Sequence, residues 1–159
     1  MRMTALAMLA VLVIGTGWTA GHAAVTPPGA AVATPKNVAD QAFDGLRQGL
    51  TAGKWDAFFA LLADDFTFWF PTGKYLGPHQ GKAQAMEFFQ YVSSAFPGGI
   101  RVVEVRRQSG GGNTFVYEFR DEGTLRGEPY KNRVAISLDV CGDKICGYRE
   151  YFGSDGKIN

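Results

Sequence analysis

The chain has 159 residues, which suffices for one domain with a sizeable core once its ends are set aside. Its 16 basic and 15 acidic residues give a formal net charge of +1, so we expect no nucleic-acid partner. Two cysteines are too few for a disulfide-dense scaffold, and the domain must therefore be stabilised by its core.

The N-terminus has the pattern of a secretory signal peptide. Arg2 is the only charged residue before Lys36, residues 5–14 form a short apolar run, and residues 21–23 form a small-x-small cleavage site. We expect a signal peptide over residues 1–23 and a periplasmic or secreted protein that does not contact the membrane after cleavage. The alternative is an uncleaved anchor, although the apolar run is shorter than the ~20 residues that span a bilayer.

Small residues and prolines over residues 24–34 predict a flexible linker before a domain at residues 35–155. Thr34 and Pro35 are typical of a helix start, and helical spacing of apolar residues continues to about Gly53. A shorter helix is expected over residues 55–63, where the aromatic side chains are interpreted as core.

A strand and a third helix follow. Residues 66–70 alternate as a strand that Pro71 ends, and residues 81–96 carry the apolar stripe of a helix. The loop between them contains His79.

Strands are expected over residues 100–107 and 114–124, followed by a closing hairpin at residues 130–152. The triple glycine at residues 110–112 lies between two strands and is interpreted as a hairpin turn, not a phosphate loop. Helices first and antiparallel strands afterwards predict an α+β fold, with a cone-shaped curved antiparallel sheet wrapped around three N-terminal helices.

The register of the closing hairpin depends on its loop. A three-residue loop at residues 141–143 would join the two apolar faces and place Glu150 opposite Val134. An even loop would leave Glu150 in a polar setting and bring Cys141 close to Cys146. We favour three residues, which disfavours a disulfide, although paired, core and reactive cysteines all stay open.

Under this register Glu150 is the best candidate for a catalytic residue. Burial disfavours the charged form of a carboxylate, which raises its pKa toward the range that serves acid–base chemistry. Asn132 and Tyr130 share the same face and are candidates to orient Glu150 or a ligand. The alternative is that Asn132 and Glu150 only satisfy each other in a structural network.

The abundance of aromatic residues on the inward faces of the strands is compatible with a ligand pocket, although a filled core predicts the same residues. The expected ligand-binding residues are Phe68, Phe70, Tyr117, Tyr148, Phe152 and His79. No metal site is expected, because one histidine after processing and two nearby cysteines fall short of a zinc set. No cofactor is expected either, since the chain has no P-loop and no dinucleotide fingerprint.

Three local patterns carry a resemblance to a known family. These are the segment at residues 62–73 (LADDFTFWFPTG), the Tyr130-x-Asn132 pattern, and the turn and strand that end in Arg-Glu-Tyr-Phe at residues 149–152. Together they resemble the nuclear transport factor 2-like superfamily, in its SnoaL-like and ketosteroid-isomerase-like branch. The resemblance covers about residues 35–153 and implies the fold, but that superfamily mixes enzymes with non-catalytic binding domains.

Ketosteroid isomerases, in which the protein environment tunes carboxyl pKa values, use a carboxylate base and an oxyanion hole made of a tyrosine and a protonated aspartic acid. In this sequence the base position matches Phe70 and the tyrosine position matches Leu46. The oxyanion acid position matches Ile136, or Ala135. The resemblance therefore implies a cavity without that chemistry.

Three hypotheses about function follow. The chain binds a small, largely apolar molecule and transforms it by cofactor-free acid–base chemistry of the isomerase, cyclase or hydrolase type. Alternatively, it is a non-catalytic ligand-binding or dimerisation domain, with a homodimer formed through the outer face of the sheet. A structural accessory domain with a filled core is a third reading.

Overall fold

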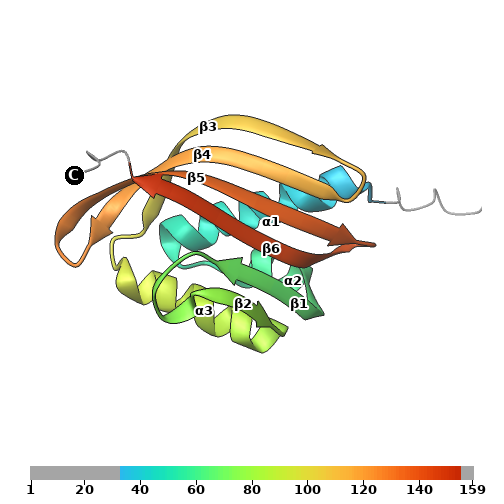
Figure 1. Ribbon diagram of the computed structural model, residues 1–159, viewed down its shortest axis with the longest axis horizontal. Coiled ribbons are helices and arrows are strands. Elements are labelled where there is room, and N and C mark those ends of the chain that lie inside the picture. Colours follow the sequence, from blue (N-terminus) through green and yellow to red (C-terminus); the bar gives the residue numbers. More distant parts are fainter. Residues whose placement is uncertain (1–32, 155–159) are drawn as a thin grey trace, which may run out of the picture. The chain divides into compact units, whose positions relative to one another are not determined.

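The computed structural model describes residues 33–154, so the predicted signal peptide and most of the predicted linker lie outside the described residues. The described helices are α1 (Pro35–Ala52), α2 (Asp56–Leu61) and α3 (Lys82–Ala95), with a 3₁₀ turn η1 (Gly73–Tyr75). The strands are β1 (Leu62–Phe70), β2 (Gly77–Gln80), β3 (Ile100–Gly111), β4 (Thr114–Leu125), β5 (Glu128–Cys141) and β6 (Lys144–Ser154). Three helices packed on one face of a curved sheet confirm the α+β prediction (Figure 1).

The six strands form one sheet in the order β2-β1-β6-β5-β4-β3. The expectation of a wholly antiparallel sheet was wrong, because β1 pairs with β6 in parallel. Residues 71–143 lie between these two strands, so no tight turn forces them to run in opposite directions. Strand β2 was expected to be a loop. It is a short edge strand containing Pro78, held by its pairing with β1.

Helix α1 begins and ends as its sequence predicts. The Thr34 side chain accepts a hydrogen bond from the backbone N–H of Asn37, and Pro35 occupies the first turn. Gly53 ends the helix in the left-handed region, at φ 67°. Gly49 allows α1 to approach the next helix, since a β-carbon there would lie 2.0 Å from the Trp55 ring.

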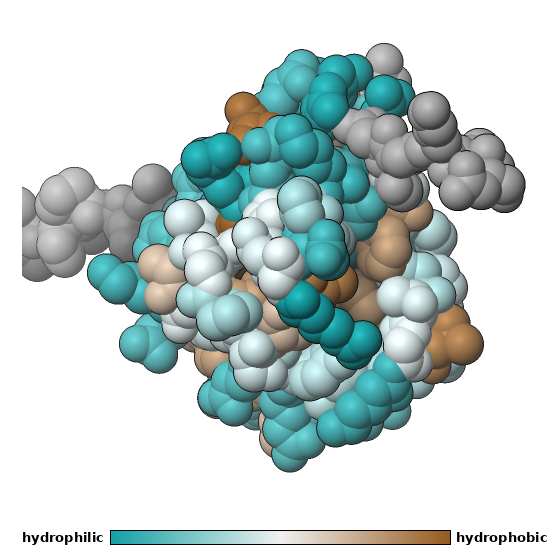
Figure 2. Space-filling model, turned by 90° about the vertical axis from the view of Figure 1, so that its left-hand side faces the viewer, coloured by the Kyte–Doolittle hydropathy of each residue, from teal (hydrophilic) through white to brown (hydrophobic). Residues whose placement is uncertain are grey.

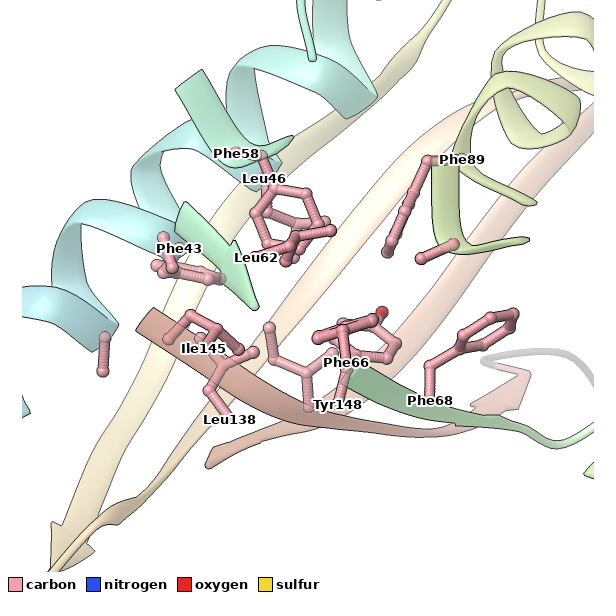
Figure 3. Close-up of a cluster of buried hydrophobic side chains, with 14 of the residues drawn as sticks. Phe43, Leu46, Phe58, Leu62, Phe66, Phe68, Phe89, Leu138, Ile145 and Tyr148 are labelled. Carbon is pink, nitrogen blue, oxygen red and sulfur yellow. The ribbon is translucent and has the colours of Figure 1, made fainter. Parts of the chain in front are cut away.

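The core lies between the helices and the inner face of the sheet. Figure 3 shows Leu46, Phe58 and Phe89 pointing from the helices toward Leu138 and Tyr148 on the sheet. These five side chains are at most 2 % exposed. Burial of each large apolar side chain contributes roughly 1.5–3 kcal/mol, so this core holds the helices against the inner face of the sheet.

Within residues 33–154, no helix combines the length and apolar character that a membrane crossing requires.

Candidate functional site

A pocket of about 280 Å³ lies between the inner face of the sheet and α3. Its wall is rich in aromatic residues, which include Phe70, Phe88, Phe89, Phe119 and Phe152. On the face shown in Figure 2, hydrophobic residues lie recessed beneath a surround of more hydrophilic ones. The volume is near the lower end of small-molecule pockets, and the wall offers mainly apolar surface.

The closing hairpin has a two-residue turn, so the preferred three-residue loop was wrong. Cys141 pairs with Lys144, and Gly142 takes the positive φ of 66° that the first central position of such a turn needs. The even loop brings the cysteines together, and Cys141 and Cys146 form a disulfide with their α-carbons 5.8 Å apart. The expectation that the hairpin disfavours a disulfide is therefore corrected.

A β-bulge reverses the consequence that an even loop was expected to have for Glu150. Val140 pairs with Ile145, but Asp139 pairs with Gly147, so Cys146 is an extra residue on β6. The extra residue shifts the register, and Glu150 pairs with Ile136 on the apolar face instead of with Val134. The disulfide and the inward-facing carboxylate coexist.

Glu150 borders the pocket and accepts a hydrogen bond from the Tyr148 hydroxyl. Removal from water raises its pKa to about 7, the Tyr148 hydrogen bond opposes the rise, and the charge of Asp121 adds to it. No cation among the described residues contributes to this pKa. At neutral pH Glu150 therefore exchanges readily between its acid and carboxylate forms.

Asp121 is a second carboxyl group in the same pocket, and sequence reasoning missed it. Its side chain lines the cavity although the residue is only 5 % exposed. Burial raises its pKa to about 7, against the lowering effect of hydrogen bonds from the backbone N–H groups of Asn132 and of Asp121 itself. Its Oδ1 atom has no hydrogen-bond partner within the described residues, so that oxygen is available to a ligand.

The sequence did contain a signal for Asp121. Phe115, Tyr117 and Phe119 were expected on the inner face of their strand, and period-two alternation places Asp121 next on that face. The pattern was followed only through its aromatic residues, so the carboxylate that continues it was overlooked.

Tyr130 and Asn132 lie together beside Asp121, as their shared face on β5 predicts. The Tyr130 hydroxyl donates to the Asn132 amide oxygen at 2.6 Å, in the orientation that also lets the Asn132 NH₂ group reach the carbonyls of Lys131 and Gly153. Asn132 does not line the pocket but supports Tyr130, which does. Burial, followed by the charges of Asp121 and Glu150, raises the pKa of Tyr130, so the phenol stays protonated.

The structure brings Phe70, Tyr148 and Phe152 to the pocket wall with Glu150 and Tyr130. The three other expected ligand-binding residues do not line this cavity. Phe68 and His79 stack on each other at 4.7 Å between ring centres, and a ring nitrogen of His79 lies 3.0 Å from the Tyr75 carbonyl oxygen.

Tyr117 is also outside the cavity wall. Its hydroxyl donates to Asp40 on α1 at 2.8 Å, and its ring stacks on Phe43 at 4.3 Å. Tyr117 points inward because it contacts α1 through this hydrogen bond and this ring. The strand pattern alone had suggested that it contacts a ligand.

The positions that match the ketosteroid isomerase groups remain apolar in the structure. Phe70 lines the pocket, whereas Leu46 and Ile136 are buried in the core at 1 % exposure each. The pocket nevertheless contains carboxyl groups, which come from Asp121 on β4 and Glu150 on β6. Within residues 33–154, no cluster of three His, Cys, Asp or Glu side chains is arranged to hold a metal ion.

Comparison with known proteins identifies the family. Residues 43–148 match the model of the SnoaL-like domain. A nuclear transport factor 2-like protein from Anabaena variabilis is 54 % identical and superposes with a TM-score of 0.74, over 77 % of this chain and 92 % of that one. A search of curated proteins found no match.

Two more distant structures show the same fold. A protein from Xanthomonas campestris that bears the name of a candidate polyketide cyclase is 17 % identical, with a TM-score of 0.63 over 76 % of this chain and 93 % of that one. A protein from Bacillus subtilis named as a candidate isomerase is 18 % identical, with a TM-score of 0.63 over 76 % and 89 % of the two chains. By its matched domain and its fold, this chain belongs to the SnoaL-like family of the nuclear transport factor 2-like superfamily.

Proposed function

We propose that the protein binds a small, largely apolar molecule in this pocket and moves a proton on it with Asp121 and Glu150, without a cofactor. The observation that carries the proposal is the presence of two carboxyl groups in one aromatic-walled cavity, each with a pKa raised to about 7. Structural burial alone gives little reason to keep two uncompensated carboxyl groups, because each costs free energy when ionised.

A carboxyl group whose pKa lies near the operating pH serves equally as proton donor and proton acceptor. While one of the pair is ionised and abstracts a proton beside a ligand carbonyl, the other donates a hydrogen bond to the carbonyl oxygen as a neutral acid. Burial of Tyr148 and its proximity to Glu150 raise its pKa well above the ordinary value. Tyr148 therefore acts as a hydrogen-bond donor to Glu150 and not as a base.

The reaction class that fits is proton transfer next to a carbonyl, as in isomerisation or ring closure. Two structural neighbours are named as a candidate isomerase and a candidate polyketide cyclase. At 17–18 % identity these neighbours share the fold alone. The support for the chemistry therefore comes from the pocket of this chain.

The test is exchange of carbon-bound protons for deuterium in D₂O, followed by proton NMR on cyclohexanone, acetophenone and 2-tetralone. The wild type should accelerate exchange beside at least one carbonyl, and Glu150→Gln and Asp121→Asn should each slow it by about 10²-fold or more. Glu122→Gln is the matched control. Glu122 lies on the same strand as Asp121, but it forms ion pairs with Arg101 and Lys131. Equal rates in all four proteins would contradict the proposal.

The second candidate function is a non-catalytic ligand-binding or dimerisation domain. Tyr151 on β6 is 52 % exposed and stacks on Trp69 at 5.1 Å between ring centres, which gives the sheet an aromatic surface patch. A homodimer through this patch would appear as a concentration-dependent mass in analytical ultracentrifugation, and Tyr151→Glu should abolish it. Ligand stabilisation that survives Glu150→Gln, without any exchange activity, would favour this function.

We also propose that the protein is exported to the periplasm or secreted after cleavage behind Ala23. The disulfide between Cys141 and Cys146 supports this location, because such bonds persist in oxidising compartments.

A further inference from the structure

Two cationic side chains lie at the rim of the pocket, in contrast to the carboxyl groups inside it. Lys74 in η1 and Arg126 between β4 and β5 line the same cavity as Asp121 and Glu150, and both are exposed. Neither forms an ion pair with another residue of the described part of the chain. Their charges are therefore available to a bound molecule.

The position of Lys74 is defined by two aromatic rings. Its Nζ atom lies 5.2 Å from the ring centre of Tyr75 and 5.8 Å from that of Tyr91, within the range of cation–π attraction. Tyr75 and Tyr91 also line the pocket, so the ammonium group is held beside the opening.

Arg126 lies in a turn whose backbone geometry disfavours arginine. It forms a two-residue turn with Gly127, since Leu125 pairs with Glu128, and both turn residues have positive φ, 53° and 88°. Such turns strongly favour asparagine, aspartate or glycine. Arg126 is the only non-glycine residue at positive φ within residues 33–154, so its side chain stands at the rim at a cost in backbone conformation.

The interior cannot accept the charged end of an anion. Asp121 and Glu150 have no compensating cation among the described residues, and a further negative charge there would be both desolvated and repelled by whichever carboxyl group is ionised. An anionic group is favoured only at the rim, where water and two cations surround it. The distribution of charge therefore fixes the direction in which an amphipathic molecule enters.

We propose that the ligand is a small apolar carboxylate, which binds with its carboxylate between Lys74 and Arg126 and its apolar body in the aromatic interior. This proposal rests on the proposed function, because it assumes that the pocket is the ligand site. It adds the substrate class, and it assigns Lys74 and Arg126 as specificity-determining residues. A neutral polar group at the far end of the ligand then reaches Asp121 and Glu150.

Calorimetric titration with three probes of one chain length tests the proposal: octanoate, octanamide and octylammonium, at pH 7 and low salt. Octanoate should bind at least about fivefold more tightly than octanamide, the gain expected from about 1 kcal/mol of charge interaction at an exposed site, and octylammonium should bind least. Raising the salt concentration should weaken the binding of octanoate and of neither other probe, because salt screens the charges at the rim.

Variants separate the rim from the rest of the pocket. Lys74→Gln and Arg126→Asn should each lower the affinity for octanoate severalfold and leave the affinity for octanamide unchanged. Arg126→Asn should also keep or raise the melting temperature, since asparagine suits the turn, so lost binding would not reflect lost folding. Lys131→Gln is the control, because Lys131 is an exposed cation that does not line this pocket.

The outcomes distinguish the two proposals. Equal binding of octanoate and octanamide, or tighter binding of octylammonium, overturns the carboxylate proposal and leaves the ligand pocket in place. Rim variants that match the wild type overturn the assignment of Lys74 and Arg126. If none of the three probes binds, both the carboxylate proposal and the ligand pocket fail.

Discussion

Replacing Asp121 with asparagine should make the protein more stable at neutral and alkaline pH. The folded state raises the pKa of Asp121 from 3.8 to about 7, so the folded protein holds this proton more tightly than the unfolded chain does. The contribution of Asp121 to stability is therefore greatest below pH 4 and falls as the pH rises toward 7. Asparagine retains an oxygen that can accept the same backbone hydrogen bonds but never becomes charged.

The size of the effect follows from the pKa difference. About three pKa units at ~1.4 kcal/mol each give a penalty of about 4 kcal/mol for the ionised Asp121 above pH 7. The penalty develops between pH 4 and pH 7, where the stability of the wild type should fall by up to ~1.4 kcal/mol for each pH unit that this group titrates. The variant lacks this slope, and the difference between the two proteins should grow steadily with pH.

Urea unfolding followed by circular dichroism at half-unit intervals from pH 4 to pH 8.5 measures this difference. The decisive quantity is the slope of the free energy of unfolding against pH. Any fixed cost of inserting an amide changes the free energy of the variant by the same amount at every pH. Removing Asp121 also removes one cause of the raised Glu150 pKa, so the remaining titration should move to lower pH.

Glu122→Gln is a control with the opposite sign. Hydrogen bonds and charge from Lys131, with a smaller effect of Arg101, lower the pKa of Glu122. The stabilising contribution of ionised Glu122 is therefore present above its ordinary pKa and lost in acid. At neutral pH the free energy of unfolding of this variant should be lower than that of the wild type. Parallel stability curves for the wild type and Asp121→Asn would refute the assignment of Asp121 as a buried, uncompensated carboxyl.

Three further predictions concern the closing hairpin and the N-terminus. Tyr148→Phe should raise the Glu150 pKa further, since the lost hydrogen bond favours the carboxylate, and a ¹³C NMR titration of the Glu150 carboxyl measures the shift. Replacing Cys141 and Cys146 together with serine should lower the free energy of unfolding by about 2 kcal/mol, the chain-entropy value for so short a loop, as read from urea curves. Intact mass of the exported protein should correspond to cleavage after Ala23, with a further 2 Da gained on reduction, one hydrogen for each freed sulfur.

Periodicity and helix-end signals predicted most of the fold correctly. Thr34, Pro35 and Gly53 act locally, so the first helix could be placed almost to the residue. Strand β2 could not, because Gly77 and Pro78 have no strand propensity and acquire order only from pairing with β1. The parallel β1–β6 pair was missed for a similar reason, since no local sequence encodes a contact between distant strands.

The candidate site, like the fold, could be predicted from the sequence only in part. Glu150, Tyr130 and Tyr148 were placed on inner faces by alternation alone, and the structure puts them at the pocket. Alternation gives direction but not depth, which is why Tyr117, on an equally apolar face, contacts Asp40 instead of the cavity. The rim residue Arg126 had no sequence signal beyond a turn, because its role depends on which segment folds over the opening.

The bulge at Cys146 explains why the disulfide and the buried Glu150 looked mutually exclusive in the sequence. A two-residue turn brings the cysteines together, but in a regular ladder it would direct Tyr148 and Glu150 to the outer face of the sheet. Burial of Tyr148, at 2 % exposure, opposes that arrangement by roughly 1.5–3 kcal/mol for such a side chain. One extra residue on β6 satisfies both demands, since Cys146 lies between the turn and Tyr148 and shifts the register before Tyr148 and Glu150 are reached. The disulfide spans this irregularity and ties the bulged residue to the opposite strand, so it holds the register that keeps Glu150 in the pocket.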